Sequence, residues 1–184
     1  MTPNPLQTKY SDFQINTLNQ LIDALSNNVD APYNDILRSM DVPCSEFDDV
    51  SSWSGESYTR NCIICNESFE LILLCWEPRH VTPIHDHGGQ ECWVKVLKGE
   101  LKETIYEEHV EGEPIPVRSF ISKPGDITYM VDFMGCHRLE NLMNERALSL
   151  HLYAKPIETC NIYDAESELF VPKIMTYDRM HDAS

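Results

Sequence analysis

Residues 83–99 read Pro-Ile-His-Asp-His-Gly-Gly-Gln-Glu-Cys-Trp-Val-Lys-Val-Leu-Lys-Gly, and the fold prediction rests on this segment. His85 and His87 are one residue apart, so on a strand both side chains point to the same face. Two imidazoles on one face can bind one metal ion, and a third histidine from a later strand would complete a three-nitrogen site. Imidazole suits iron, zinc, copper and nickel, so these ligands alone do not identify the metal.

Two later segments extend the pattern, namely Lys123-Pro-Gly-Asp and Gly135-Cys-His-Arg-Leu-Glu-Asn141. Together with the histidine pair and Gly99 they resemble the two-part signature of cupins, which are small double-sheet β-barrels. A lone His-x-His pair is weak evidence, since histidines pair by chance. The same pair followed by Pro-Gly and by His137 four positions before Asn141 is much more specific.

The main departure from the cupin pattern concerns its glutamate. Counting back from Gly99, the position where most cupins add a glutamate to the three histidines holds Cys92. Glu91 is adjacent, but alternation along a strand turns it to the opposite face unless a bulge intervenes. Without that glutamate, all the protein ligands are neutral. A bound divalent metal then keeps its full positive charge and favours an anionic substrate ligand such as a thiolate.

From about Tyr58 to about Tyr177 the chain resembles the cysteine dioxygenases, thiol dioxygenases of the eukaryotic type. Besides the histidine motifs, the resemblance rests on Tyr58-Thr-Arg60-Asn, Leu73-Leu-Cys-Trp76, Leu97-Lys-Gly-Glu-Leu-Lys-Glu-Thr104, Ser149-Leu-His151-Leu-Tyr153 and Glu158-Thr-Cys160. It implies that ferrous iron is bound by His85, His87 and His137.

The resemblance also implies roles around the metal. Arg60, with Tyr58 beside it, would hold the substrate carboxylate, and a thioether bond would join Cys92 to Tyr153. Ser149, His151 and Tyr153 would form a hydrogen-bonded row, and Cys160 and Met175 would lie near the cavity. The implied reaction oxidises L-cysteine with O2 to cysteine sulfinic acid. The iron would bind the substrate thiolate and amine, and Tyr153 would orient the substrate or the oxygen.

Elementary chemistry agrees with two of these roles. Ser149, His151 and Tyr153 alternate, so their side chains share one face of one strand and can fix one another by hydrogen bonds. The guanidinium of Arg60 is a planar fork of donors that matches a carboxylate.

The remaining histidines and cysteines are expected to be structural. We expect His80, His109 and His181 at the surface, and Cys44, Cys75 and Cys136 buried or half-buried. Cys62 and Cys65 form a Cys-x-x-Cys without the context of a redox or zinc site, so we interpret them as strand residues. The related enzymes have serine-proline after the tyrosine, whereas this chain has Ala154-Lys155-Pro156.

Composition limits the possible partners and compartment. The formal net charge is −16, which disfavours nucleic-acid phosphates and anionic membranes as partners. We find no secretory signal and no span long and apolar enough for a membrane. We therefore expect a cytoplasmic monomer whose seven cysteines stay reduced.

The chain is read as one mainly β domain over residues 1–184: a cupin (double-stranded β-helix, or jelly-roll) barrel with an N-terminal helical layer. Helices are predicted from Asp12 to about Asn27 and from Pro32 to about Met40, the second capped by Asp30, within a helical part at about 1–45. The barrel is predicted over about 55–180, with residues 106–119 as a variable hairpin loop. Strands are predicted at 57–65, 69–76, 92–97, 101–106, 127–131 and 147–153.

Three alternatives stay open. The nearest is a thiol dioxygenase for 3-mercaptopropionate or cysteamine; cysteamine has no carboxylate for Arg60, and relatives that use 3-mercaptopropionate usually carry glutamine at that position. A second is another metal-dependent cupin enzyme, such as an isomerase, which would be expected to keep the glutamate that Cys92 replaces. A third is a non-enzymatic binding or storage cupin, a class that often loses its metal ligands.

Overall fold

The computed structural model describes residues 14–27, 32–107 and 113–181. The chain divides into two compact units, Met1–Asp49 and Val50–Ser184, and each is described by itself. The prediction that residues 1–184 form one domain, with the helices layered on the barrel, stays a prediction.

The first unit is helical. It contains α1 (Leu18–Asn27), α2 (Tyr33–Arg38) and the 3-10 helix η1 (Cys44–Val50), whose last residue opens the second unit. In α1 the buried residues recur at helical spacing, namely Leu18, Leu21, Ala24 and Leu25. Both helices are shorter than predicted, and the expected start at Asp12 and cap at Asp30 lie outside the described residues. Pro32 occupies the N-cap position of α2 without a side-chain cap bond.

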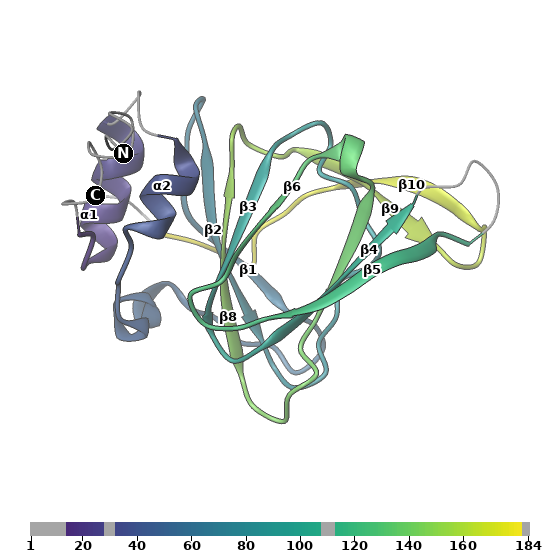
Figure 1. Cartoon of the computed structure of the whole chain (residues 1–184), viewed down its shortest axis with the longest axis horizontal. Coiled ribbons are helices and arrows are strands. Elements are labelled where there is room, and N and C mark those ends of the chain that lie inside the picture. Colours follow the sequence, from purple (N-terminus) through teal and green to yellow (C-terminus); the bar gives the residue numbers. More distant parts are fainter. Residues whose placement is uncertain (1–13, 28–31, 108–112, 182–184) are drawn as a thin grey trace, which may run out of the picture. The chain divides into compact units, whose positions relative to one another are not determined.

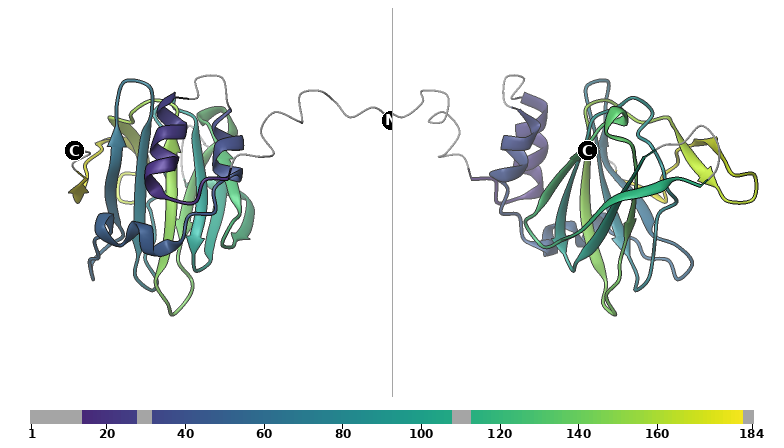
Figure 2. Two further views of the ribbon diagram at one scale, coloured as in Figure 1. Left: turned by 90° about the vertical axis from the view of Figure 1, so that its left-hand side faces the viewer. Right: turned by 45° about the vertical axis from the view of Figure 1, so that its right-hand side comes forward.

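The second unit is built from sheets, as Figure 1 and Figure 2 show. The largest sheet has the strand order β11-β1-β2-β8-β3-β6, and smaller sheets have the orders β5-β4-β7 and β10-β9. All pairs are antiparallel except β1 with β11. The strands are β1 (Thr59–Cys65), β2 (Glu70–Trp76), β3 (Cys92–Lys98), β4 (Leu101–Glu107), β5 (Ile115–Ser122), β6 (Ile127–Met130), β7 (Cys136–Glu140), β8 (Ala147–Tyr153), β9 (Thr159–Asp164), β10 (Leu169–Ile174) and β11 (Arg179–Met180).

The centre of the large sheet explains how polar side chains reach the interior. Every residue of β2 and β8 is buried. Opposite residues of neighbouring strands share a face, and Ser149 of β8 lies between Leu74 of β2 and Val96 of β3. Two residues along, and so on the same face, His151 lies between Ile72 and Val94. The core face of the sheet therefore carries a row of polar groups inside an apolar frame.

The six predicted strands are present, with ends that differ by at most two residues. The loop predicted at 106–119 is wrong in part, because β4 continues to Glu107 and β5 already begins at Ile115. Pro116 makes this strand hard to recognise in the sequence, because proline has no backbone N–H to donate to a β-ladder. It is tolerated here because β5 is an edge strand and the pairing register shifts between Ile105 and Tyr106.

No helix in the described part of the chain is long and apolar enough to cross a membrane.

Candidate metal centre and active site

The histidine pair lies between β2 and β3 in an irregular segment and not on a strand, which corrects the prediction. Pro83 and the turn at Gly88 and Gly89 interrupt regular pairing. His85 instead forms isolated bridges with His137 of β7 and with Ile162 of β9. The N–H of His85 donates to the carbonyl of His137 at 3.0 Å, and the reverse bond is 2.9 Å. The two predicted ligands are therefore held opposite each other by their own backbones.

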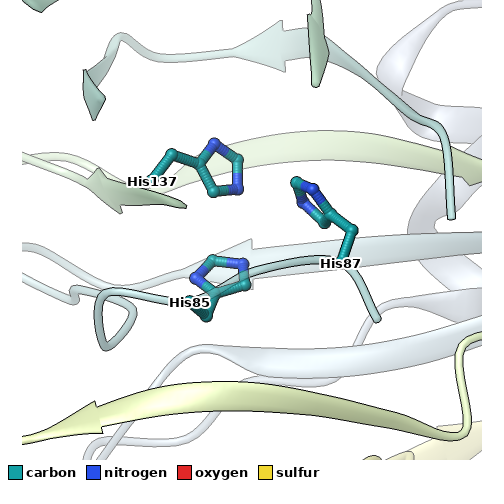
Figure 3. A group of neighbouring side chains, drawn as sticks. All are labelled: His85, His87 and His137. Carbon is teal, nitrogen blue, oxygen red and sulfur yellow. The ribbon is translucent and has the colours of Figure 1, made fainter. Parts of the chain in front are cut away.

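The three predicted metal ligands do come together. One ring nitrogen from each of His85, His87 and His137 lies within 4.8 Å of the others. Figure 3 shows the three rings converging on a common point. Nε2 of His137 is buried without a hydrogen-bond partner among the described residues, and Nδ1 of His85 is already occupied 3.0 Å from the Pro83 carbonyl. The unpaired Nε2 of His137 and the other ring nitrogen of His85, Nε2, are therefore available to a metal ion.

A buried carboxylate that sequence reasoning missed supports the third histidine. Glu103 of β4 is 1 % exposed, and its Oε1 lies 2.7 Å from Nδ1 of His137. A carboxylate on the outer nitrogen fixes the tautomer and orientation of a metal-binding imidazole. Nδ1 of His137 donates in this arrangement and Nε2 remains for the metal. In the sequence, Glu103 could have been recognised as a buried residue because it shares a strand face with Leu101. It also lies within the segment that resembles the cysteine dioxygenases.

Two aspartates fix the loop that carries the histidine pair. Asp132 accepts the backbone N–H of His87 at 3.0 Å and that of Gly89 at 2.5 Å. Asp86 accepts the N–H of Gly88 at 3.0 Å and both the backbone and side-chain N–H groups of Asn161, at 2.8 and 2.6 Å. The loop is thus tied to η2 (Asp132–Met134) and to β9, which limits the positions that the imidazoles can take.

Burial keeps the imidazoles of His85 and His87 uncharged. Burial and the neighbouring His137 lower the pKa of His85 to about 3. Burial is also the main reason why the pKa of His87 lies well below its usual range. Both rings are therefore neutral near pH 7, which is the form that coordinates a metal.

A pocket lies next to His85 of the histidine cluster, and the predicted substrate-binding residues line it. Its walls include Tyr58, Arg60, His85, Tyr153, Cys160 and Met175. Tyr58 stacks on Trp76 with ring centroids 5.0 Å apart. The Cys160 thiol lies 3.2 Å from the Met175 sulfur. The structure therefore brings together, in one pocket, residues that are more than 100 positions apart in the sequence.

Among the described residues, Arg60 is the only arginine lining this pocket, and it is 9 % exposed. Its Nε donates to the carbonyl of Thr176 at 3.2 Å, while its Nη2 is buried without a hydrogen-bond partner among the described residues. Burial lowers the pKa of Arg60, but attraction to Tyr153 and Glu70 outweighs that effect and raises it. The guanidinium stays charged and keeps donor capacity for an anion.

The polar row on β8 is partly formed as predicted. The Trp76 indole N–H donates to Oγ of Ser149 at 2.9 Å, and Oγ lies 2.8 Å from Nε2 of His151. Because Ser149 accepts from Trp76, its own hydrogen is available for His151. The continuation from His151 to Tyr153 stays a prediction.

Cys92 and Tyr153 are directly opposite in the β3–β8 register and are both buried. Burial, then the thiol of Cys92, raises the pKa of Tyr153 well above its usual range. Glu91 is exposed and accepts a hydrogen bond from the Tyr129 hydroxyl, so strand alternation turns it outward as predicted. The pairing is compatible with the predicted cross-link, which stays a prediction.

With this geometry in place, comparison with known proteins identifies the family. A family model described as cysteine dioxygenase type I matches residues 6–166. The chain is 32% identical to cysteine dioxygenase type 1 of Danio rerio over 155 residues, covering 82% of this chain and 77% of that protein. It is 38% identical to the Bos taurus enzyme of the same name over 124 residues, 65% of this chain and 62% of that one.

The chain belongs to the cysteine dioxygenase type I family.

Membership in the cysteine dioxygenase family confirms the predicted enzyme class. Together with the histidine cluster it supports a metal-dependent thiol dioxygenase. For the fold, a solved protein with a double-stranded β-helix domain from Klebsiella pneumoniae superposes with a TM-score of 0.51. The identity is 16% over 62% of this chain and 86% of that one, so this likeness supports the fold alone, in agreement with the predicted barrel.

The other predicted residues have mixed outcomes. His80 is buried, contrary to prediction, because its Nδ1 accepts the N–H of Glu77 at 3.0 Å within the turn after β2. His181 is exposed as predicted, and His109 lies outside the described residues. Cys62 and Cys65 are strand residues of β1, as expected. Cys75 and Cys136 are buried and Cys44 is half-buried, also as expected.

Proposed function

We propose that this cysteine dioxygenase family member oxidises L-cysteine with O2 to cysteine sulfinic acid at a ferrous ion held by His85, His87 and His137. One observation carries the proposal: ring nitrogens of three histidines, two of them buried and one half-buried, converge beside a pocket that also contains a buried arginine. The metal site fits a redox ion with open coordination positions, and the arginine fits the carboxylate of an amino acid.

Iron is proposed because of the donor set. Three neutral nitrogens without a carboxylate leave the metal its full charge, which favours a thiolate substrate, and imidazole suits iron. When bound, the iron would supply the redox chemistry that joins oxygen to sulfur. The residues of the chain would bind the substrate, orient it and keep water out.

Arg60 is proposed to bind the substrate carboxylate. Its Nη2 is a buried donor without a hydrogen bond, and such a group costs about 1–3 kcal/mol when it stays unpaired. An amino-acid carboxylate in the pocket would pair with it. Tyr58, which shares the pocket, would limit the movement of the guanidinium through its stacking on Trp76.

Tyr153 is proposed as a hydrogen-bond donor beside the reacting sulfur or oxygen. Burial, more than any other cause, raises the pKa of its hydroxyl well above the usual range, so the group keeps its proton at neutral pH. A thioether to Cys92 would fix the ring. The Trp76–Ser149–His151 chain would hold the neighbouring imidazole in one orientation.

The experiment is oxygen uptake by the iron-loaded protein with cysteine, 3-mercaptopropionate and cysteamine, for the wild type and for Arg60→Ala. We expect the wild type to prefer cysteine, and Arg60→Ala to lose far more activity on cysteine than on cysteamine. A wild-type preference for 3-mercaptopropionate would show that cysteine is not the preferred substrate. Equal losses of activity on cysteine and on cysteamine would refute the proposal that Arg60 binds the substrate carboxylate.

A further inference from the structure

A second charged residue, Glu70, lies behind Arg60 with no access to solvent. It is the first residue of β2 and 0% exposed. It is opposite Tyr153 in the β2–β8 register, and Tyr153 is in turn opposite Cys92 of β3. Paired residues share a face, so Glu70 belongs to the same transverse row as the predicted cross-link pair. A buried carboxylate is costly unless it is paired, so its contacts indicate its role.

Glu70 connects three separate segments. The backbone N–H of Ile157, in the loop after β8, donates to Oε2 at 2.8 Å. The Tyr177 hydroxyl, in the segment after β10, also bonds to Glu70; burial first, and then this bond, raise the pKa of Tyr177. On the third side Oε1 lies 3.7 Å from Nη2 of Arg60. One carboxylate therefore links the loop after β8 to the segment after β10 and faces the guanidinium.

The contact with Arg60 is close but incomplete. Oε1 of Glu70 and Nη2 of Arg60 are both buried, and neither has a hydrogen-bond partner among the described residues. At 3.7 Å the attraction holds the guanidinium, while Nη2 remains available to another acceptor. The second attachment of Arg60, from Nε to the Thr176 carbonyl, comes from the residue next to Tyr177. Glu70 and the 176–177 segment thus hold Arg60 from two sides.

We propose that Glu70 is a positioning residue that aims Arg60 at the carboxylate of the substrate, and so contributes to the preference for amino-acid thiols. This inference rests on the proposed function, because it assigns Glu70 an effect only through Arg60. It differs from a purely structural role, which would lower stability without changing the recognition of the carboxylate.

The test is a double-mutant cycle on the full-length, iron-loaded enzyme with cysteine as substrate. Glu70→Gln keeps an oxygen to accept the Ile157 N–H and removes the charge that faces Arg60. We expect KM for cysteine to rise about tenfold with little change in kcat. In the Arg60→Ala background the same change should add no further loss, because its target is absent. Glu166→Gln, at an exposed glutamate in the β9–β10 turn, is the matched control.

Three results would overturn the proposal: an unchanged KM in Glu70→Gln, a fall in kcat alone, or losses that add to those of Arg60→Ala. If Glu70→Gln does not fold, Glu70→Asp carries the test, since it keeps the charge and shifts it by one methylene. A raised KM for cysteine in Glu70→Asp supports the role, and a wild-type KM rejects it. A wild-type enzyme without activity on cysteine would instead reject the proposed function.

Discussion

Glu103 illustrates what a single residue contributes to the metal centre. Its carboxylate is the partner of the outer nitrogen of His137, at 2.7 Å. We predict that Glu103→Gln weakens iron binding by about 10–100-fold, because an amide is a poorer acceptor and holds the imidazole less firmly. Iron content after dialysis against a chelator measures this. Glu107→Gln, exposed on the same strand, is the control, and equal iron retention in the two variants would contradict the prediction.

The buried imidazole of His151 should make the stability of the protein depend on pH. Burial, and then Arg60, hold the pKa of His151 well below 6.5 in the folded chain. Below about pH 6.5 the unfolded chain binds a proton that the folded chain does not, so stability falls as pH falls, by up to about 1.4 kcal/mol per pH unit. Urea unfolding of the metal-free protein between pH 7 and about pH 5 should show a smaller slope for His151→Gln. The same substitution at the exposed His181 is the control. A slope that His151→Gln leaves unchanged would refute the assignment.

The sequence predicts the metal-binding histidines better than the residues that hold the site's side chains in place. His85, His87 and His137 follow from motif spacing. Glu103 does not, because its reach to His137 depends on the β4–β7 register, in which Glu103 is opposite Leu139 and His137 is opposite Ile105. The same holds for Glu70, whose partners come from β1, from the loop after β8 and from the segment after β10.

Among the elements, the β3–β8 pair carries a covalent prediction. Cys92 and Tyr153 are opposite in register, which allows a thioether between the sulfur and the ring carbon next to the hydroxyl. Its formation removes one hydrogen from each partner, with O2 as oxidant. Peptide mass spectrometry should detect a linked pair lighter by two hydrogen atoms in the wild type and in Cys44→Ser, and none in Cys92→Ser. A wild-type protein that remains wholly unlinked after turnover would contradict this.

The ligand loop gives a second prediction for elements. Gly88 has φ +57°, and a Cβ there would lie 2.2 Å from the Thr159 carbonyl oxygen of β9. Gly88→Ala should therefore displace the loop next to His87 and lower both iron content and melting temperature. Gly89 also has a positive φ, but a Cβ there would meet nothing within 4 Å. Gly89→Ala therefore measures the effect of backbone strain without the collision. Equal effects of the two substitutions would show that the collision is unimportant.

Element boundaries show where sequence patterns fail. Strands with strong apolar or alternating patterns, such as β2 and β8, are predicted nearly to the residue. By contrast, the sequence pattern places the first half of β5 in a loop, because Pro116 and a polar, exposed pattern obscure an edge strand. The irregular backbone around His85 was also missed, since its pairing partners come from β7 and β9 and not from its sequence neighbours.

For the whole molecule, family membership and the histidine cluster support a metal-dependent thiol dioxygenase. That its pocket recognises an amino-acid thiol is our proposal. The family was predictable because its motifs extend over most of the chain. The predicted cytoplasmic location and monomeric state stay predictions, as does the relation between the two units. The proposed substrate and iron are what a direct experiment must establish.

The proposed activity can be tested by the reaction of the ferrous-loaded protein with L-cysteine under isotopically labelled O2. Oxygen uptake and the mass of the product are recorded together. The account predicts cysteine sulfinic acid in which both added oxygen atoms come from the gas. No uptake despite full iron occupancy, or a product that lacks either labelled atom, would contradict it.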